Sequence, residues 1–370
     1  ISIGGVDMEL VPITKRQEQL QSQLRTRGSG PISSIFGLIL LTLLQAAMLM
    51  GFLLSGVEEE YPSYVLGFCS VAICQWGLFL FYAVIHRSSF EVETLAFFLC
   101  TLGMAAIATV KPGEILKQAA AMVLGVLTFL LIGWSLRDLE RAKRCRYLAV
   151  LLGVGFLVIT LLFGREYYGA KNWLVIGGLS LQPSELSKVC FVYAGASTMD
   201  RIMNKRNLIL FIAYSVVICG LLALMNDFGT AMIFFCAFLI IAYLRSGSVG
   251  TIALACTALG FAGVLAIRIA PHALNRFATW RHIWENPYSS GYQQTQAIMC
   301  IASGGLFGLG AGKGFLQKVF AADSDIVFAT ISEEWGLLLA LLAVLAVAAL
   351  GFFAIRTSRM SRSSFYCIGG

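Results

Sequence analysis

Long apolar runs separated by short polar segments dominate the pattern of this chain. A helix needs roughly 20 apolar residues to cross a hydrocarbon core of about 30 Å. Ten segments reach or approach this length, at 35–56, 64–85, 93–110, 115–136, 146–163, 184–199, 207–224, 229–244, 250–270 and 326–351. Helices are the natural choice for such segments because they satisfy their own backbone hydrogen bonds within lipid. The pattern therefore predicts an all-α, polytopic transmembrane helical bundle of about ten spans.

The composition leads to the same class of protein. Hydrophobic residues make up 58% of the 370 residues and charged residues 13%, and the mean hydropathy is +0.81. Soluble proteins carry about 25% charged residues, so this chain has too few charges to cover a water-exposed surface. The composition excludes a disordered chain, a secreted disulfide scaffold and an ordinary cytosolic enzyme.

The basic residues orient the predicted spans. The segment 137–146 carries five of them, and the positive-inside rule makes it cytoplasmic. Because four spans precede it, the segment 1–34 is also cytoplasmic, as is the tail after 351. The acidic segment 57–63 and the long loop 271–325 then lie outside. This distribution explains the net charge of +7 without a nucleic-acid partner.

The chain ends, the cysteines and the histidines give further expectations. The first thirty residues contain no apolar core and are not a signal peptide, whereas the final S-S-F-Y-C-I-G-G is expected to enter a further span. The ten cysteines are scattered singly, with no C-x-x-C spacing, and the three histidines form no ligand set. The sequence therefore predicts neither a disulfide framework nor a metal site.

Charged residues at membrane depth are functional candidates, and the outer segment before 184–199 contains several. Pro183 suits the first turn of a helix, which places Glu185 and Lys188 on one face, three residues apart. Two interpretations stay open. One is an ion pair that steadies a short helix. The other is an anion or phosphate site at the helix N-terminus, with Lys171 and Lys188 nearby.

Two further outer segments contain polar residues. Asp227 directly precedes a predicted span, so an N-cap is favoured over a catalytic role, although it can serve as both. The loop 271–325 is far longer than usual, which indicates function, and it contains Gln293 and Gln296. Its glycine-rich stretch 303–314 does not fit a phosphate-binding P-loop. That motif requires Gly where Phe307 stands, and Ser or Thr where Gly314 stands.

A third set of acidic residues begins the span 326–351. On a helix that opens at Asp325, Glu333 lies about 80° around the axis from Asp325, whereas Glu334 lies on the opposite face. We therefore expect Glu333, more than Glu334, to share a polar cavity with Asp325. The alternative is that Asp325 caps the helix and both glutamates face neighbouring spans.

Six segments from about Gly164 to Gly370 together resemble the SEDS family of cell-wall proteins, the RodA/FtsW/SpoVE group. They are G-A-K-N-W-L (169–174), L-Q-P-S-E-L-S-K (181–188), N-D-F-G-T (226–230), G-Y-Q-Q-T-Q-A-I (291–298), S-G-G-L-F-G-L-G (303–310) and D-S-D-I-V-F-A-T-I-S-E-E-W-G (323–336). The chain departs from the family at Asp323-Ser324, where His-Thr is common, and at Asn172, where Arg is common. It also has five spans in 35–163 where the family has about three, and the family's last two spans are absent.

The resemblance implies a peptidoglycan glycosyltransferase in the bacterial cytoplasmic membrane, which polymerises lipid II at the outer leaflet beside a class B penicillin-binding protein. It places Asp325 on the family's essential carboxylate, and so implies a catalytic Asp325. It implies substrate-binding roles for Lys171, Trp173, Glu185, Lys188, Asp227, Gln293, Gln296 and Glu333. A divalent cation, Mg or Mn, is expected by family analogy, with no ligands identified.

The mechanism predicted on this basis is an inverting glycosyl transfer in which Asp325 is the general base. The alternative is a transporter of lipid-linked cell-wall precursors, because charged residues inside spans also suit substrate paths. A carrier is expected to place ionisable groups on both sides of the midplane, near broken helices. Here they gather on the outer half, which favours chemistry at the outer leaflet.

Overall fold

A computed structural model of the chain describes residues 31–55, 58–86, 90–167, 170–176, 179–198, 205–246 and 282–360, with a few isolated positions between 250 and 260. The described residues form two compact units. The first comprises those within 1–119 and 300–346, and the second those within 120–299 and 347–370. Each unit is described by itself.

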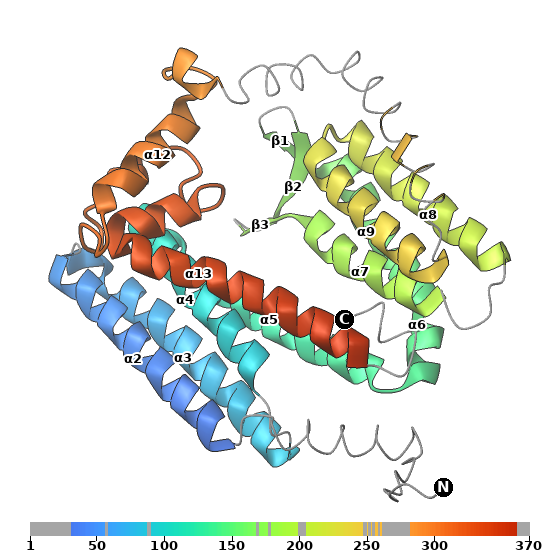
Figure 1. The fold of residues 1–370 in the computed structure, drawn as a ribbon, viewed down its shortest axis with the longest axis horizontal. Coiled ribbons are helices and arrows are strands. Elements are labelled where there is room, and N and C mark those ends of the chain that lie inside the picture. Colours follow the sequence, from blue (N-terminus) through green and yellow to red (C-terminus); the bar gives the residue numbers. More distant parts are fainter. Residues whose placement is uncertain are drawn as a thin grey trace, which may run out of the picture. The chain divides into compact units, whose positions relative to one another are not determined.

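The N-terminal helices of the first unit pack side by side (Figure 1). They are α2 (Pro31–Ser55), α3 (Tyr61–Val84) and α4 (Glu91–Val110), and each contacts the other two. Buried polar side chains join them: Gln45 Nε2 donates to Gln75 Oε1 and to Thr101 Oγ1, both at 3.0 Å. Inside lipid such interhelical bonds hold helices together because water offers no competing partner.

The C-terminal end of α2 packs against the beginning of the last long helix, α13 (Val327–Met360). The rings of Phe52 and Trp335 lie 5.8 Å apart, and Gly51 leaves room for Trp335 because an added Cβ would lie 3.1 Å from its ring. Ser55 Oγ also donates to the Ala311 carbonyl at 2.6 Å. The first predicted span is therefore part of the packing around the glycine-rich segment.

The second unit is a helical bundle around an aromatic core. It contains the residues of α5 (Ile115–Leu136) from 120 onward, with α6 (Leu139–Phe163), α7 (Pro183–Thr198), α8 (Lys205–Leu224) and α9 (Phe228–Ser246). Helices α7, α8 and α9 lie next to one another in Figure 1, and α7 contacts both of the others. Phe191 of α7 lies at the centre, with its ring centroid 5.3 Å from that of Phe211 and 5.2 Å from that of Phe234.

A small antiparallel sheet precedes α7, so the all-α prediction needs this addition. Its strands are β1 (Arg165–Tyr167), β2 (Ala170–Ile176) and β3 (Leu179–Leu181), in the order β1-β2-β3. Trp173 pairs with Arg165 on one side of β2, and Leu174 pairs with Leu181 on the other. The sheet lies in the segment that the sequence places outside the membrane.

The predicted spans, except 250–270, fall on helices of the described residues. The structure describes six helices long and apolar enough to cross a membrane, α2, α3, α4, α5, α6 and α13, and two shorter apolar ones in α8 and α9. Most of 250–270 lies outside the described residues, as does 1–30. The basic segment 137–146 is largely the start of α6, and the long outer loop contains an unpredicted helix, α12 (Tyr292–Gly304).

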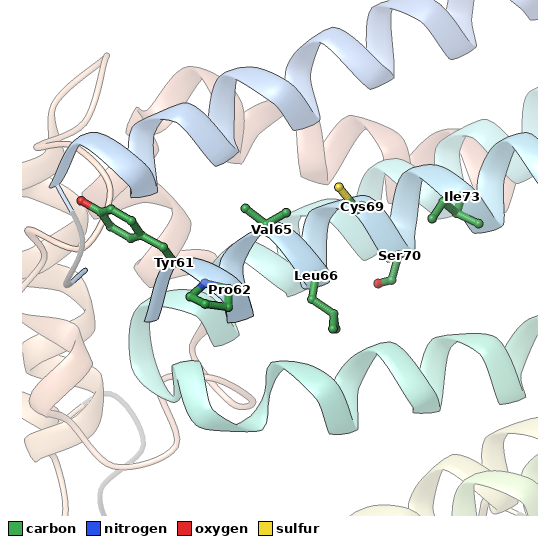
Figure 2. Close-up of a pocket in the computed structure, with 7 residues that line it drawn as sticks. All are labelled: Tyr61, Pro62, Val65, Leu66, Cys69, Ser70 and Ile73. Atoms are coloured by element: carbon green, nitrogen blue, oxygen red, sulfur yellow. The ribbon is translucent and has the colours of Figure 1, made fainter. Parts of the chain in front are cut away.

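The outward faces of these helices are apolar. Leu54 and Val84 are 82% and 77% exposed, which suits contact with acyl chains. Figure 2 shows one such surface, a shallow pocket on a single stretch of α3 whose lining is almost wholly apolar. Its lining residues are Tyr61, Pro62, Val65, Leu66, Cys69, Ser70 and Ile73. The lining includes no side chain that is charged at neutral pH, so this pocket suits an apolar surface rather than a polar site.

Candidate functional site

The helix α13 is interrupted at Gly336. The preceding glycine-rich segment supplies the hydrogen-bond partners that the interrupted helix lacks. In a continuous helix the carbonyls of residues 333 and 334 would accept from the N–H groups four residues later. Gly336 instead has φ 87° and ψ 161°. The Glu333 and Glu334 carbonyls accept from Leu309 and Gly310, both at 2.9 Å, and the N–H groups of residues 337 and 338 donate to the carbonyls of residues 305 and 306, at 3.0 and 3.4 Å. Each of the four backbone groups that lack a partner within the helix therefore forms a hydrogen bond with the glycine-rich segment.

This exchange brings two backbones so close that side chains are excluded. A Cβ on Gly308 would clash with the Glu334 carbonyl, and a Cβ on Gly336 would clash with the Leu306 carbonyl. Both glycines also have positive φ values, of 82° and 87°, which other residues rarely adopt. The motifs at 303–310 and 333–336 are therefore the two halves of one local structure.

Glu333 and Glu334 extend this structure to the next segment. Both are 1% exposed. Glu333 accepts from the backbone N–H groups of Phe315 and Leu316, at 2.8 and 3.0 Å. Glu334 accepts from the Gly314 N–H at 3.2 Å and from Thr109 Oγ1 of α4 at 2.6 Å. Such charge-assisted bonds are strong and offset the cost of burying a carboxylate.

Asp325 lies in a turn two residues before α13 begins at Val327. Its backbone N–H donates to the Ala321 carbonyl at 2.9 Å, and Ala321 adopts a left-handed φ of 55°. The Thr330 hydroxyl, buried in α13, donates to the Ala322 carbonyl at 3.0 Å and ties the turn to the helix. The Asp325 side chain itself is exposed, and Ser324 Oγ lies 3.3 Å from its Oδ1.

The position of Asp325 changes one prediction. The 80° separation between Asp325 and Glu333 assumed a helix continuous from Asp325, whereas α13 begins later. Glu333 does not face an open cavity beside Asp325, because both of its oxygens hold backbone N–H groups. Glu334 has the same kind of structural role, although the sequence placed it on another face. The structure therefore separates one exposed carboxylate from two buried ones.

In the second unit, β2 and the turn before α9 meet. The Lys171 N–H donates to the Met225 carbonyl at 2.9 Å, and Asn172 Nδ2 donates to Asp227 Oδ2 at 3.1 Å. The other oxygen of Asp227 accepts from the Thr230 N–H at 3.1 Å, so the predicted N-cap of α9 is confirmed. The strand carries Lys171 and Trp173, both half-buried.

The predicted helix start at Pro183 is also confirmed. Lys188 Nζ lies 2.7 Å from Glu185 Oε2, with side-chain exposures of 27% and 58%, so the two form the predicted i,i+3 ion pair. The strand β2 contacts α7. The structure thus gathers Lys171, Trp173, Asp227 and the first turns of α7 in one unit through these strand and turn contacts.

The predicted glutamines lie on α12, a helix that the sequence did not predict. Gln293 and Gln296 are three residues apart and both are half-buried. Asp325 and Glu333 belong to the first unit, and the other predicted site residues belong to the second.

The described residues provide no metal-binding cluster, and the buried Cys300 beside Glu333 is not a reactive thiolate. Within them, no group of three His, Cys, Asp or Glu side chains is placed to hold a metal ion. The carboxylate nearest Asp325 in sequence, Asp323, is paired with Lys111 at 2.8 Å. The divalent cation stays a prediction, and no chemistry is assigned to it. Burial, and then the Glu333 carboxylate, raise the pKa of Cys300 to about 12, so its thiol is protonated at neutral pH.

The apolar helices and the polar turns at their ends define a multi-pass helical membrane protein with an exposed carboxylate where its last long helix begins. Residues 66–369 match the cell cycle protein family of FtsW, RodA and SpoVE. The chain belongs to this family, and it is a multi-pass protein of the bacterial inner membrane.

Similar curated proteins carry two related names. The peptidoglycan glycosyltransferase RodA of Mycobacterium tuberculosis is 29% identical over 67% of this chain and 57% of its own length. The probable peptidoglycan glycosyltransferases FtsW of Nitrosococcus halophilus and Hahella chejuensis are 32% and 30% identical, over 61% and 64% of this chain and 60% and 63% of theirs. The chain thus spans about 57–63% of the length of these relatives.

Solved structures share the fold. A chain from a study of how a peptidoglycan synthase complex coordinates polymerization and crosslinking has a TM-score of 0.59 and 21% identity, covering 76% of this chain and 80% of that one. The crystal structure of the Thermus thermophilus rod shape determining protein RodA has a TM-score of 0.52 and 21% identity, covering 76% and 79%. These similarities support the helical architecture.

Proposed function

We propose that this chain is a peptidoglycan glycosyltransferase that polymerises lipid II at the outer leaflet. Its membership of the family and the names of its curated relatives support this activity. The observation that carries the proposal is the exposed Asp325 carboxylate, held on an anchored turn while the neighbouring acidic groups are paired or buried.

The reaction needs a base because a sugar alcohol is a poor nucleophile. In the proposed step the 4-hydroxyl oxygen of the acceptor attacks the anomeric carbon of the donor, and its proton passes to the Asp325 carboxylate. A new C–O bond forms as the bond to the lipid pyrophosphate breaks, and the pyrophosphate leaves with its electron pair. A positioned base typically contributes about 10²–10⁴ in rate.

The leaving pyrophosphate needs positive charge. We propose that, within the second unit, Lys171, Lys188 and the N-terminus of α7 at Pro183, where backbone N–H groups lack helical partners, bind a phosphate group of the lipid-linked substrate. The ion pair between Glu185 and Lys188 orients the ammonium in the absence of substrate. We further propose a class B penicillin-binding protein as the crosslinking partner.

The test is a polymerisation assay with lipid II, purified full-length protein and its transpeptidase. Asp325→Asn keeps the size of the side chain but cannot take the proton, so glycan polymer is expected to fall at least about 100-fold. Asp325→Glu, which retains a carboxylate, is the matched control and is expected to keep part of the activity. Full polymer formation by the Asn variant would remove Asp325 from the mechanism.

The alternative function is transport of lipid-linked precursors. Liposomes loaded with lipid II distinguish the two, because an enzyme makes polymer whereas a carrier exchanges lipid II between leaflets without polymer. The placement of the exposed Asp325 carboxylate on an outer turn, rather than within a broken helix at the midplane, favours the enzyme.

A further inference from the structure

A single ion pair joins the turn that carries Asp325 to the end of another helix. Lys111 Nζ lies 2.8 Å from Asp323 Oδ2, across 212 residues of sequence. Lys111 follows the last residue of α4, and Asp323 lies two residues before Asp325. We propose that Lys111 is a positioning residue, which fixes the Asp325 turn through Asp323. The inference rests on the proposed role of Asp325 as the base.

The Lys111 backbone is well fixed, so it can serve as an anchor. Its N–H donates to the Ile107 carbonyl at 2.8 Å, and its own carbonyl accepts from the Glu114 N–H at 2.9 Å. Pro112, whose φ is restricted, follows it in the short helix Pro112–Glu114. The backbone is therefore fixed on both sides of Lys111, and the ammonium group extends from this fixed position.

Asp323 depends on this ammonium because it is largely removed from water. Its side chain is 16% exposed, and its Oδ1 is buried without a hydrogen-bond partner in the described residues. A carboxylate in this environment needs a compensating charge. Without Lys111 the lowest-energy response is for Asp323 to move toward water, and residues 324 and 325 move with it.

The backbone of the turn has other anchors at both ends, because the Ile326 carbonyl, directly after Asp325, accepts from the Ala329 and Thr330 N–H groups at 2.9 and 3.1 Å. The Ala322 carbonyl is held by Thr330, and the N–H groups of Ser324 and Asp325 both donate to the Ala321 carbonyl, at 3.2 and 2.9 Å. These bonds define the start of the turn and its curvature. Within the described residues, the ion pair with Lys111 is the side-chain bond by which residues 323–326 reach another helix. It therefore adds a constraint on the Asp323 side of the turn that the backbone bonds do not supply.

The expected effect is on rate rather than on overall stability. Because 49% of the Lys111 side chain is exposed and Asp323 can turn toward water when the lysine is removed, loss of the ion pair is expected to change folding stability little. A catalytic group displaced by about 1 Å, in contrast, loses as much as 100-fold in rate. Removing Lys111 is therefore expected to lower kcat while the melting temperature and KM stay near those of the wild type.

The alternative role for Lys111 is direct contact with the substrate pyrophosphate, since 49% of its side chain is exposed. Exchanging the two charges separates these roles. In Lys111→Asp/Asp323→Lys the pair can re-form, which restores positioning, but the cation has moved to the other residue. A substrate-binding lysine would not be rescued by this exchange.

The experiment compares Lys111→Met, Lys111→Arg and the charge exchange in full-length protein with lipid II. We expect kcat to fall about 10- to 100-fold in Lys111→Met with KM within about twofold, and to recover to within about fivefold in the other two. Arg141→Met is the control, because Arg141 is ion-paired with Asp138 at 4.0 Å in the basic segment. An unrescued exchange, or a KM increase that accounts for the loss, would overturn the proposal.

A second measurement does not require activity. Amide hydrogen exchange of residues 321–325 is expected to accelerate about tenfold or more in Lys111→Met and to return in the charge exchange, because the turn loses and regains its anchor. Unchanged exchange in Lys111→Met contradicts the positioning role even if no polymer is made. If Asp325→Asn stays fully active while exchange behaves as expected, the proposed base is wrong and the anchor remains.

Discussion

Three carboxylates near the outer end of α13 have different environments and therefore different roles. Asp325 is exposed on a turn, whereas Glu333 and Glu334 are 1% exposed and hold the backbone of residues 314–316. The buried pair supports the segment that leads to the Asp325 turn. Loss of either glutamate is therefore expected to act on folding first and on chemistry second.

Glu333→Gln tests this division. The amide has one oxygen where the carboxylate has two, so either the Phe315 or the Leu316 N–H would face an NH₂ group. Leaving one buried donor unsatisfied costs about 1–3 kcal/mol. We expect a lower apparent Tm in detergent, measured by thermal unfolding. Glu185→Gln, at a 58% exposed side chain, is the control and is expected to change the Tm little.

Several residue roles followed from the sequence because their partners are local. The Asp227 cap and the ion pair of Glu185 with Lys188 depend on residues three positions away, and both were predicted. The roles of Glu333 and Glu334 were missed because their backbone partners lie 17 to 20 residues away, in a segment without periodicity, and Thr109, the other partner of Glu334, lies 225 residues away. The pair of Lys111 with Asp323 was missed for the same reason, because its members lie 212 residues apart.

At the scale of elements, the break in α13 is a joint between a helix and a glycine-rich segment. Gly336→Ala is expected to disrupt it, because the new Cβ would clash with the Leu306 carbonyl at an unfavourable φ. Folded yield and apparent Tm are the measurements. Gly351→Ala in the same helix is the control, since its Cβ would meet nothing within 4 Å, and it is expected to be neutral or to stabilise by up to about 1 kcal/mol. Equal behaviour of the two variants would contradict the joint.

The helices could be predicted because each apolar run is long enough to be recognised from the sequence without knowledge of its tertiary contacts. The strands β1 to β3 were missed, although the run A-K-N-W-L-V-I is rich in residues that favour strands and glycines flank it. The helix α12 was missed because its sequence mixes polar and apolar residues over only 13 positions. The sequence pattern alone therefore gave no clear helical signal for α12.

At the scale of the whole molecule, the distribution of basic residues specifies an orientation. The segment 137–146 is expected on the cytoplasmic side and the Asp325 turn on the outer side. Single cysteines in a cysteine-free background test this with a membrane-impermeant thiol reagent. Ser324→Cys is expected to react in intact cells, and Arg137→Cys only after permeabilisation, since both positions are exposed in the structure. Labelling of Arg137→Cys in intact cells would reverse the assignment.

The joint at Gly336 also restricts which parts of the protein can move. Separating residues 305–310 from α13 would break four backbone hydrogen bonds and leave eight main-chain groups without these partners. The glycines at this joint, a residue type often associated with flexibility, therefore form a fixed part of the structure, and larger motions are expected in other parts of the chain.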